Sequence, residues 1–436
     1  MNKIILMIFG LLFTISITGC GSGVGSSAKD MPHLEPTYMA LSTQPATLTP
    51  KTTILGTTQN NLLGNRLVDG SIDLKTASIL DIPINSEPRW LVSAPFNGGA
   101  LFVAVMDNGA TQAFKISGSA YVAYDILPAQ LPIGMPPLLA ISDSNIQLIL
   151  PPEDASPFTN PLLINNKLAY IATNGDLVLG DSTGQTRLPV NALPDARILM
   201  DENNRLLILT QPTNRYDHDV LGDDLEASSI TLLDTQPELR IIREIPIEAP
   251  DVIEGISPIW ADIDNDGIRD IIVTLSNNQS GARIVAFLED GTLLAESPAI
   301  QIGYRWRHQI AVSAFGINPQ PILVSIRTPH IGGVIEFFQF NNGKLEIVRE
   351  VDGFSSHSIG SRNLDSAIIG DFNNDGISEL LAPDQAHSNL GVIAIDGGIT
   401  VLPLDGVLTS NLSATVVDGK LIVGAGTQGN LRIWIQ

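Results

Sequence analysis

The stretch PIWADIDNDGIRDIIVTL, residues 258–275, contains the pattern from which the fold can be predicted. Two apolar runs rich in Ile and Val flank a turn of Asp, Asn and Gly, which indicates a pair of antiparallel strands. A second copy, AIIGDFNNDGISELLAP, lies at residues 367–383. The segments AVSAFGINPQPILVSI (311–326) and ATVVDGKLIVGAG (414–426) have the same rhythm without the acidic cluster. The sequence therefore repeats a strand pair.

The repeat has a period near fifty residues. Asp262, Phe315, Asp371 and Val417 hold the same place in the four copies, at intervals of 53, 56 and 46 residues. Further strand-like runs follow each pair, and four antiparallel strands at this spacing are typical of a β-propeller blade. We therefore predict an all-β fold over residues 53–436, a β-propeller of four-stranded antiparallel blades, with seven blades. A pair of β-sandwiches would explain the strands but not the even period.

Two segments depart from the repeat. Residues 127–159 form a Pro-rich connection that carries one extra hairpin. The last copy stops at LRIWIQ, residues 431–436, after three strands. We expect a strand from residues 53–82 to complete that blade and close the ring, because closure protects the open edges of the sheets.

The N-terminus predicts export and anchoring. Residues 1–19 combine a short positive region with an apolar run too short to span a bilayer as a helix. The run ends in Ile-Thr-Gly-Cys, which resembles a bacterial lipobox, whose cysteine is acylated. The resemblance implies a lipoprotein signal peptide over 1–19, a lipidated Cys20 and a flexible tether over 20–52. Cys20 is the single cysteine, so the chain has no intrachain disulfide.

The same segment predicts a location. A lipidated Cys20 would hold the protein at the cell envelope, facing the periplasm or the cell exterior, with no other membrane contact. Because Gly21 rather than Asp follows the cysteine, the resemblance implies the outer membrane in a Gram-negative cell.

The charge excludes one class of partner. Asp and Glu number 46 against 24 Lys and Arg, a net charge of −22. A surface this negative repels nucleic acid, and it attracts divalent cations.

The acidic turns have the spacing of a cation-binding loop. Carboxylates stand at positions 1, 3, 5 and 9 of the first turn, with Gly at position 6, and the second turn keeps this register with Asn at position 3. Calcium takes six to eight hard oxygens, and a tight loop can wrap alternate side chains around one ion. Position 12 is Val273 or Ala382, so neither loop is an EF-hand. The alternative is that these residues only make turns.

The two loops resemble the FG-GAP (integrin α-chain) repeat, which also occurs in bacterial VCBS-type proteins. The resemblance implies that each loop joins the first two strands of a blade and binds calcium, with blades at about 256–300 and 364–404. It implies two calcium sites, with these ligands: Asp262, Asp264, Asp266, Ile268 and Asp270 in the first loop; Asp371, Asn373, Asp375, Ile377 and Glu379 in the second. The turns SAFGINPQ and TVVDGKL lack the carboxylates, so we expect no ion there.

A second group of residues belongs to the other face of the predicted ring. Turns between strands one and two, or three and four, emerge on one face, whereas loops between strands two and three and blade connections emerge on the other. Five of the six histidines fall in the second class, so we predict Asp262 and His330 on opposite faces. The candidate funnel residues are His218, Arg305, His308, Arg327, His330, His357, Arg362, Gln385 and His387.

These residue types allow binding or catalysis. Arg pairs with carboxylates, and His serves as a base near neutral pH or as a metal ligand. The alternative is that they hydrogen-bond neighbouring backbone and lock the blades together. We assign no catalytic residue from the sequence.

Three functions follow. The first is a lipid-anchored, calcium-binding module of the cell envelope that adheres to a glycan or protein, which predicts exposed Trp306 and Tyr216. The alternative is an enzyme, a lyase or hydrolase acting on an acidic carbohydrate, which predicts three of the five histidines in one pocket within about 10 Å. The third is a structural subunit of an envelope complex.

Overall fold

β-Strands and turns account for all the regular structure in the residues that the computed structural model describes, which are 53–142, 145–316 and 320–436. These residues belong to one compact unit, 46–436, which we describe by itself. They contain no helix, and therefore none that could cross a membrane. The predictions for residues 1–19, for the tether over 20–52 and for Cys20 lie outside the described residues.

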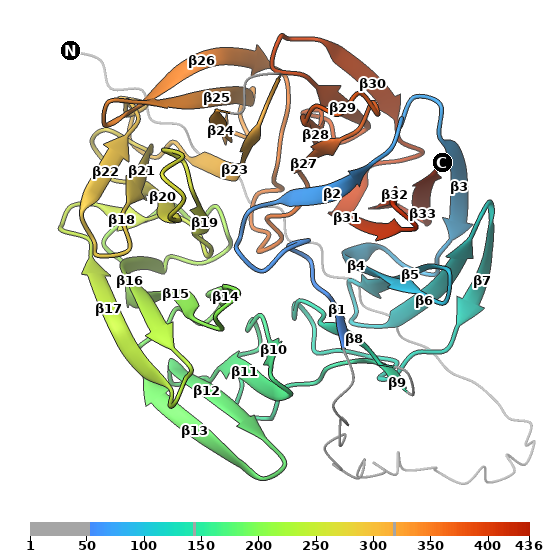
Figure 1. Cartoon of the computed structure of the whole chain (residues 1–436), viewed down its shortest axis with the longest axis horizontal. Helices are drawn as coiled ribbons and strands as arrows, with labels where there is room; N and C mark the ends of the chain where they lie inside the picture. Colours follow the sequence, from blue (N-terminus) through green and yellow to red (C-terminus); the bar gives the residue numbers. More distant parts are fainter. Residues whose placement is uncertain (1–52, 143–144, 317–319) are drawn as a thin grey trace, which may run out of the picture. The chain divides into compact units, whose positions relative to one another are not determined.

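Seven groups of four antiparallel strands repeat along the described chain and follow one another around a ring (Figure 1). The blades that carry the sites are β14–β17 (Leu199–Met200, Leu206–Thr213, Glu226–Asp234, Arg240–Pro246), β19–β22 (Ile259–Ala261, Asp270–Ser276, Arg283–Phe287, Leu293–Glu296), β23–β26 (Arg307–Ala314, Pro321–Arg327, Val334–Asn341, Lys344–Asp352) and β27–β30 (Ile368–Asp371, Glu379–Pro383, Asn389–Ile393, Ile399–Pro403).

The other blades complete the ring. They are β4–β7 (Pro88–Phe96, Gly99–Met106, Thr111–Ser117, Ala120–Tyr124), β10–β13 (Leu162–Ile164, Lys167–Ile171, Asp176–Asp181, Gly184–Pro189), and β31–β33 (Leu408–Val417, Lys420–Thr427, Asn430–Ile435) with β3 (Ser78–Pro83). The short strand β18 (Val252–Ile253) bridges β16 and β20.

The predicted count of seven blades is not confirmed. A further sheet of three strands stands between the β4–β7 and β10–β13 blades in Figure 1. Its strands are β1 (Ile54–Gly56), β8 (Leu139–Ser142) and β9 (Asn145–Leu148). The hairpin in the Pro-rich connection 127–159 thus forms a sheet of its own, because the N-terminal strand β1 pairs with it. Pairing of residues so distant in sequence leaves no local signal.

An early strand completes the last blade, as predicted. β3 pairs with β33 in antiparallel register, from Ser78 opposite Ile435 to Pro83 opposite Asn430. Side chains alternate along a strand, so Ile82 faces the core while Ile79 faces solvent. Strand β3 and the C-terminal strand β33 therefore close the ring by sharing one sheet.

The hydrophobic core lies between neighbouring blades. One cluster joins Phe337 of β25 to Leu380 of β28, and another joins Leu209 of β15 to Val285 of β21. Each blade buries a face against the next, which is why the apolar runs recur with the blade period.

Residues 57–71, the central segment, cross the middle of the ring before β3 (Figure 1) and include β2 (Leu67–Ser71). Backbone or side-chain hydrogen bonds tie this segment to the innermost strands of five blades, through the pairs Leu62–Met200, Leu63–Trp260, Asn65–Val312, Arg66–Ile369 and Asn60–Ala414. The segment adjoining the tether is therefore part of the folded unit.

An ion triad is buried beside this segment. Asp365 accepts hydrogen bonds from Arg66 Nε at 2.8 Å and from both terminal nitrogens of Arg197 at 2.8 and 2.6 Å. All three side chains are at most 2 % exposed. The triad links the central segment to the starts of the β14–β17 and β27–β30 blades.

Candidate functional site

The first acidic loop joins β19 to β20, the first two strands of a blade. The Asp262 carboxylate accepts backbone N–H bonds from Asn265, Asp266 and Gly267 at 2.7, 3.2 and 2.8 Å. Gly267 has a φ of 89°, which favours glycine and lets the loop curl around that carboxylate. One oxygen each from Asp262, Asp264 and Asp270 lies within 4.8 Å of the others.

The second acidic loop, between β27 and β28, has the same internal geometry. Asp371 accepts N–H bonds from Asp375 and Gly376 at 3.1 and 2.9 Å. Glu379 accepts from Phe372 N–H at 2.9 Å, as Asp270 accepts from Ile263 at 3.0 Å in the first loop. The shared register predicted from the sequence therefore corresponds to a shared shape.

Position seven behaves alike in both loops. Ile268 N–H donates to Asp266 at 2.7 Å, and Ile377 N–H donates to Asp375 at 2.8 Å. Asn373, at position three of the second loop, donates through its amide to both Asp375 and Glu379. The amide therefore gives two carboxylates of the second loop a hydrogen-bond donor within the loop.

Burial, together with neighbouring carboxylates, raises the pKa of the acid at position nine of each loop. Burial raises the pKa of Asp270 to about 7, and the carboxylates of Asp264, Asp262 and Asp266 add to the shift. Burial likewise raises the pKa of Glu379 to about 7, with Asp375 and Asp371 nearby. These carboxyl groups ionise more readily when a cation lies beside them. Because all the side-chain donors are oxygens, they suit a hard ion such as calcium.

The histidines lie at the opposite ends of the strands. The loops between second and third strands hold His218, His330 and His387, the connection between β26 and β27 holds His357, and His308 is the second residue of β23. Trp306 Nε1 donates to the carbonyl of Glu254, which precedes β19, whereas Asp262 follows β19. The structure thus places the acidic loops and the histidines on opposite faces.

Three histidines gather around Trp306. The ring centroids of His308, His330 and His357 lie 4.8, 6.1 and 5.1 Å from that of Trp306. The enzyme hypothesis predicts three histidines in one pocket, whereas these contacts show three imidazoles packed around one buried indole. None of the four cavities described in the structure is lined by these rings.

Hydrogen bonds fix the ring tautomers in this cluster. His357 Nε2 donates to the carbonyl of Ser361, so its Nδ1 accepts from His330 Nε2 at 2.7 Å. Burial lowers the pKa of His357 to about 3 and that of His330 to about 4. Burial also lowers the pKa of His308, whose Nδ1 lies 2.8 Å from Ser356 Oγ, and that of His387. These imidazoles are neutral at pH 7.

His218 has a different environment. Its Nδ1 lies 2.6 Å from the buried carboxylate of Glu254, which also accepts a bond from Ser276. The ring is partly exposed. Glu254 orients this imidazole and leaves Nε2 free, an arrangement that can serve proton transfer.

The remaining candidates are engaged in contacts between loops and strands. Arg327 pairs with Glu336 and Glu350, and Arg362 with Asp195 and Asp223. The Gln385 amide donates to the carbonyls of Pro329 and Phe354, Arg305 donates to the Tyr304 carbonyl, and the His387 carbonyl accepts from Leu408. The contacts of Gln385 and His387 join neighbouring blades, those of Arg327 stay within the β23–β26 blade, and those of Arg362 reach the loops around β14 and β15.

The prediction that Trp306 and Tyr216 are exposed is wrong. Each is 2 % exposed. Trp306 packs among apolar side chains from the β15–β16 loop and from two blade connections. These residues are Val220 and Leu221 in the loop, Ile256 before β19 and Leu364 before β27. An aromatic residue in a polar loop thus serves as an anchor between blades, since burying its area outweighs the desolvation of one N–H.

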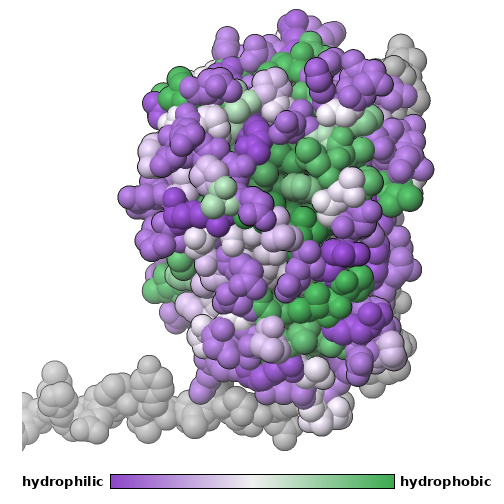
Figure 2. Space-filling model, turned by 90° about the vertical axis from the view of Figure 1, so that its left-hand side faces the viewer, coloured by the Kyte–Doolittle hydropathy of each residue, from purple (hydrophilic) through white to green (hydrophobic). Residues whose placement is uncertain are grey.

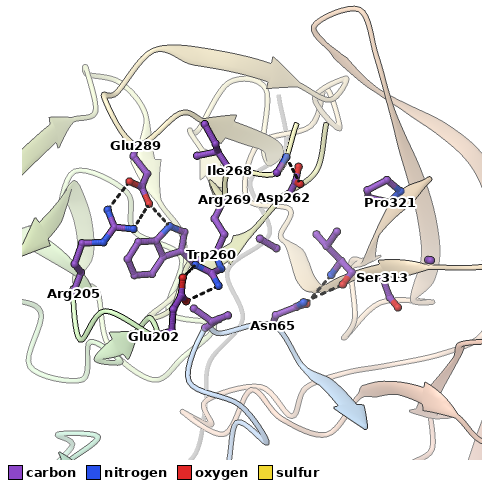
Figure 3. Close-up of a pocket in the computed structure, with 15 residues that line it drawn as sticks. Asn65, Glu202, Arg205, Trp260, Asp262, Ile268, Arg269, Glu289, Ser313 and Pro321 are labelled. Atoms are coloured by element: carbon purple, nitrogen blue, oxygen red, sulfur yellow. Dashed lines mark hydrogen bonds and ion pairs between the residues drawn. The ribbon is translucent and has the colours of Figure 1, made fainter. Parts of the chain in front are cut away.

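The sequence did not reveal a cavity of about 570 Å³ beside the first acidic loop (Figure 3). Asp262, Ile268 and Arg269 border it on one side, Ser313 and Pro321 on the other (Figure 3). Its other lining residues are Leu63, Asn65, Glu202, Arg205, Trp260, Ala261, Gly267, Glu289, Val312 and Ala314. The one hint in the sequence was the acidic turn DENN at residues 201–204. It points to this cavity only when the packing of the blades is known, because that packing brings Glu202 to the cavity wall.

No protein-family model and no curated protein matches this chain. Among solved structures, it is similar to quinohemoprotein alcohol dehydrogenase from Comamonas testosteroni (TM-score 0.52, 11% identity, 87% of this chain and 79% of that one). It is also similar to quinohemoprotein alcohol dehydrogenase ADHIIG from Pseudomonas putida HK5 (0.53, 11%, 87% and 79%). A streptogramin B lyase structure matches at a TM-score of 0.42 and 14% identity, over 84% and 99%. At these identities the likeness concerns the fold, an all-β propeller.

Proposed function

We propose that the protein is a calcium-stabilised β-propeller that works as a binding module at the cell envelope, anchored through lipidated Cys20, for a glycan or protein ligand. The calcium ions would serve structure: each would hold the carboxylates of one acidic loop together at the end of its blade. Asp262, Asp264 and Asp270 would bind the first ion, and Asp371 and Glu379 the second. The remaining ligands would be those that the FG-GAP resemblance implies.

The observation that carries this proposal is the repeated loop geometry. Two loops 109 residues apart curl around the first carboxylate with the same backbone bonds and hold a buried acid at position nine. A turn that binds no ion has no need of the four carboxylates of the first loop or the three of the second, since like charges this close destabilise the folded chain.

Chelation tests the proposal. The full-length chain in detergent should unfold at a lower temperature in excess EDTA, and saturating calcium should restore the transition. Magnesium at equal concentration should restore it less, because its octahedral preference fits such loops poorly. A transition that chelation leaves unchanged would refute the calcium role.

One observation favours a second candidate, the enzyme acting on an acidic carbohydrate. His218, oriented by Glu254 and partly exposed, has the form of a general base. Turnover of polyuronates, assayed by release of unsaturated or reducing ends, should then disappear in His218→Ala and fall in Glu254→Gln. Absence of turnover across such substrates would remove this candidate.

A further inference from the structure

We propose that the cavity beside the first acidic loop binds a basic segment of a partner protein, with a lysine or arginine side chain inserted, and that calcium in that loop strengthens this binding. The inference rests on the proposed function and names its ligand and binding face. It places the ligand on the face of the acidic loops rather than among the histidines.

The charges around the cavity favour a cation. Its lining includes the carboxylates of Glu202, Asp262 and Glu289 against the guanidiniums of Arg205 and Arg269. Both guanidiniums are already paired: Arg205 with Glu289 and Asp201, Arg269 with Glu202. The rest of the first loop adds three more carboxylates, of which one bound calcium offsets only part. The net field therefore attracts a positive group.

Glu202 is the accessible carboxylate. Its side chain is 61 % exposed, whereas the carboxylate of Glu289 is also held by Trp260 Nε1 at 3.0 Å. A ligand ammonium can share Glu202 with Arg269 without breaking a buried contact. Glu202 is thus the residue whose loss should weaken the ligand most.

The apolar part of the lining favours lysine or arginine over a sugar. Leu63, Ile268 and Pro321 offer aliphatic surface, which suits the methylene stem of a long cationic side chain. The aromatic residue of the cavity, Trp260, is buried, with Arg205 over its ring at 5.1 Å. No described aromatic ring in the lining is therefore free to stack on a sugar.

The first loop forms one wall of the cavity, which couples the two ligands. Gly267, Ile268 and Arg269 belong to the loop, and Arg269 reaches Glu202 of the neighbouring blade at 2.6 and 3.1 Å. In the second loop the corresponding residue, Ser378, meets Ser313 instead. An ion that fixes the first loop fixes the wall and the Arg269–Glu202 pair, so calcium and ligand should raise each other's affinity.

A peptide titration tests this. The probe is a short fluorescein-labelled peptide containing lysine, added to the full-length chain in detergent with calcium or with EGTA, and followed by fluorescence anisotropy. The acetyl-lysine form of the peptide and a glucosamine oligomer are the comparison ligands. Variants are Glu202→Gln, Asp262→Asn and the control Glu238→Gln, an exposed carboxylate in a turn of the same face. Calcium binding by each sample is measured separately by calorimetry.

We expect the lysine peptide to bind and its acetylated form to fail. Glu202→Gln should weaken binding about fivefold to tenfold, by removing one partly exposed charge partner. Asp262→Asn should abolish the calcium effect, and Glu238→Gln should change nothing. Equal binding of both peptides, indifference to Glu202→Gln, or tighter binding of the glucosamine oligomer would overturn the assignment. If calorimetry detects no calcium, the proposed function fails; if calcium binds and the peptide does not, only the present inference fails.

Discussion

Buried neutral imidazoles are the residues that should set the acid sensitivity of this protein. The pKa of His357 is lowered from 6.5 to about 3 by burial, so the unfolded chain binds a proton there at a pH where the folded chain does not. The stability that this residue contributes is complete above pH 6.5 and is lost as the pH falls toward 3.

His357→Gln tests that effect, since the Gln amide can still donate to Ser361. Between pH 6.5 and 4 the free energy of unfolding should fall more steeply in the parent than in the variant, by about 1.4 kcal/mol per pH unit. Urea titrations at each pH measure the two slopes, and taking their difference cancels the opposing titration of Asp270 and Glu379. Parallel slopes would contradict a buried neutral His357.

Individual residues show which contacts could be predicted from the sequence and which could not. The register of Asp262, Gly267 and Asp270 could be read directly, because the hydrogen bonds of these three residues stay within the loop. The partners of His218 and Trp306 could not be read, because Glu254 lies 36 and 52 residues away from them along the chain. The polar loops led us to predict an open funnel, but side chains such as these make contacts between blades. The sequence could not show this, because the two partners in each of these contacts are far apart along the chain.

Among the elements, the central segment makes the contact that was hardest to predict from the sequence, the ion pair of Arg66 with Asp365. Arg66 and Arg197 meet Asp365 across 299 and 168 residues. No local pattern distinguishes these residues from surface charges. Only closure of the ring brings them together in the interior.

Asp365→Asn should be strongly destabilising, because it leaves two buried guanidiniums without their counter-ion. We expect a loss of about 3–5 kcal/mol in the free energy of unfolding. Arg432→Gln is the matched control: it breaks an Arg–Asp pair that reaches the surface, for about 0–1 kcal/mol. Chemical unfolding measures both, and similar small losses would contradict the buried triad.

Strand β3 allows a test of ring closure within one element. Ile82 is fully buried against the last blade, while Ile79 in the same strand is 52 % exposed. Ile82→Ala should cost about 2–5 kcal/mol by leaving a cavity, whereas Ile79→Ala should stay within about 0.5 kcal/mol. Equal effects in thermal or urea unfolding would mean that β3 does not close the ring in solution.

For the whole folded unit, the period of the strands was enough to predict a β-propeller, but it was not enough to predict the number of sheets. Each blade repeats because each must bury its faces against neighbours, so the period survives in the sequence. The three-stranded sheet escaped prediction because β1 comes from the far N-terminal side. The side of the molecule that Figure 2 shows is largely polar and carries apolar patches, while the apolar runs of the strands pack into the clusters between blades.

The two faces divide the chemistry of the unit. One face carries acidic loops and the largest of the described cavities, and the other carries histidines and arginines that are held by hydrogen bonds and ion pairs. The proposed ligand and both proposed ions therefore share the first face.

Calorimetric titration of the full-length, metal-free chain with calcium measures whether the two acidic loops bind the ion. We expect two ions per chain, one fewer in Asp262→Asn, one fewer in Asp371→Asn, and none when both are replaced. A parent chain that takes up no calcium, or a double variant that still takes up two ions, would contradict this expectation.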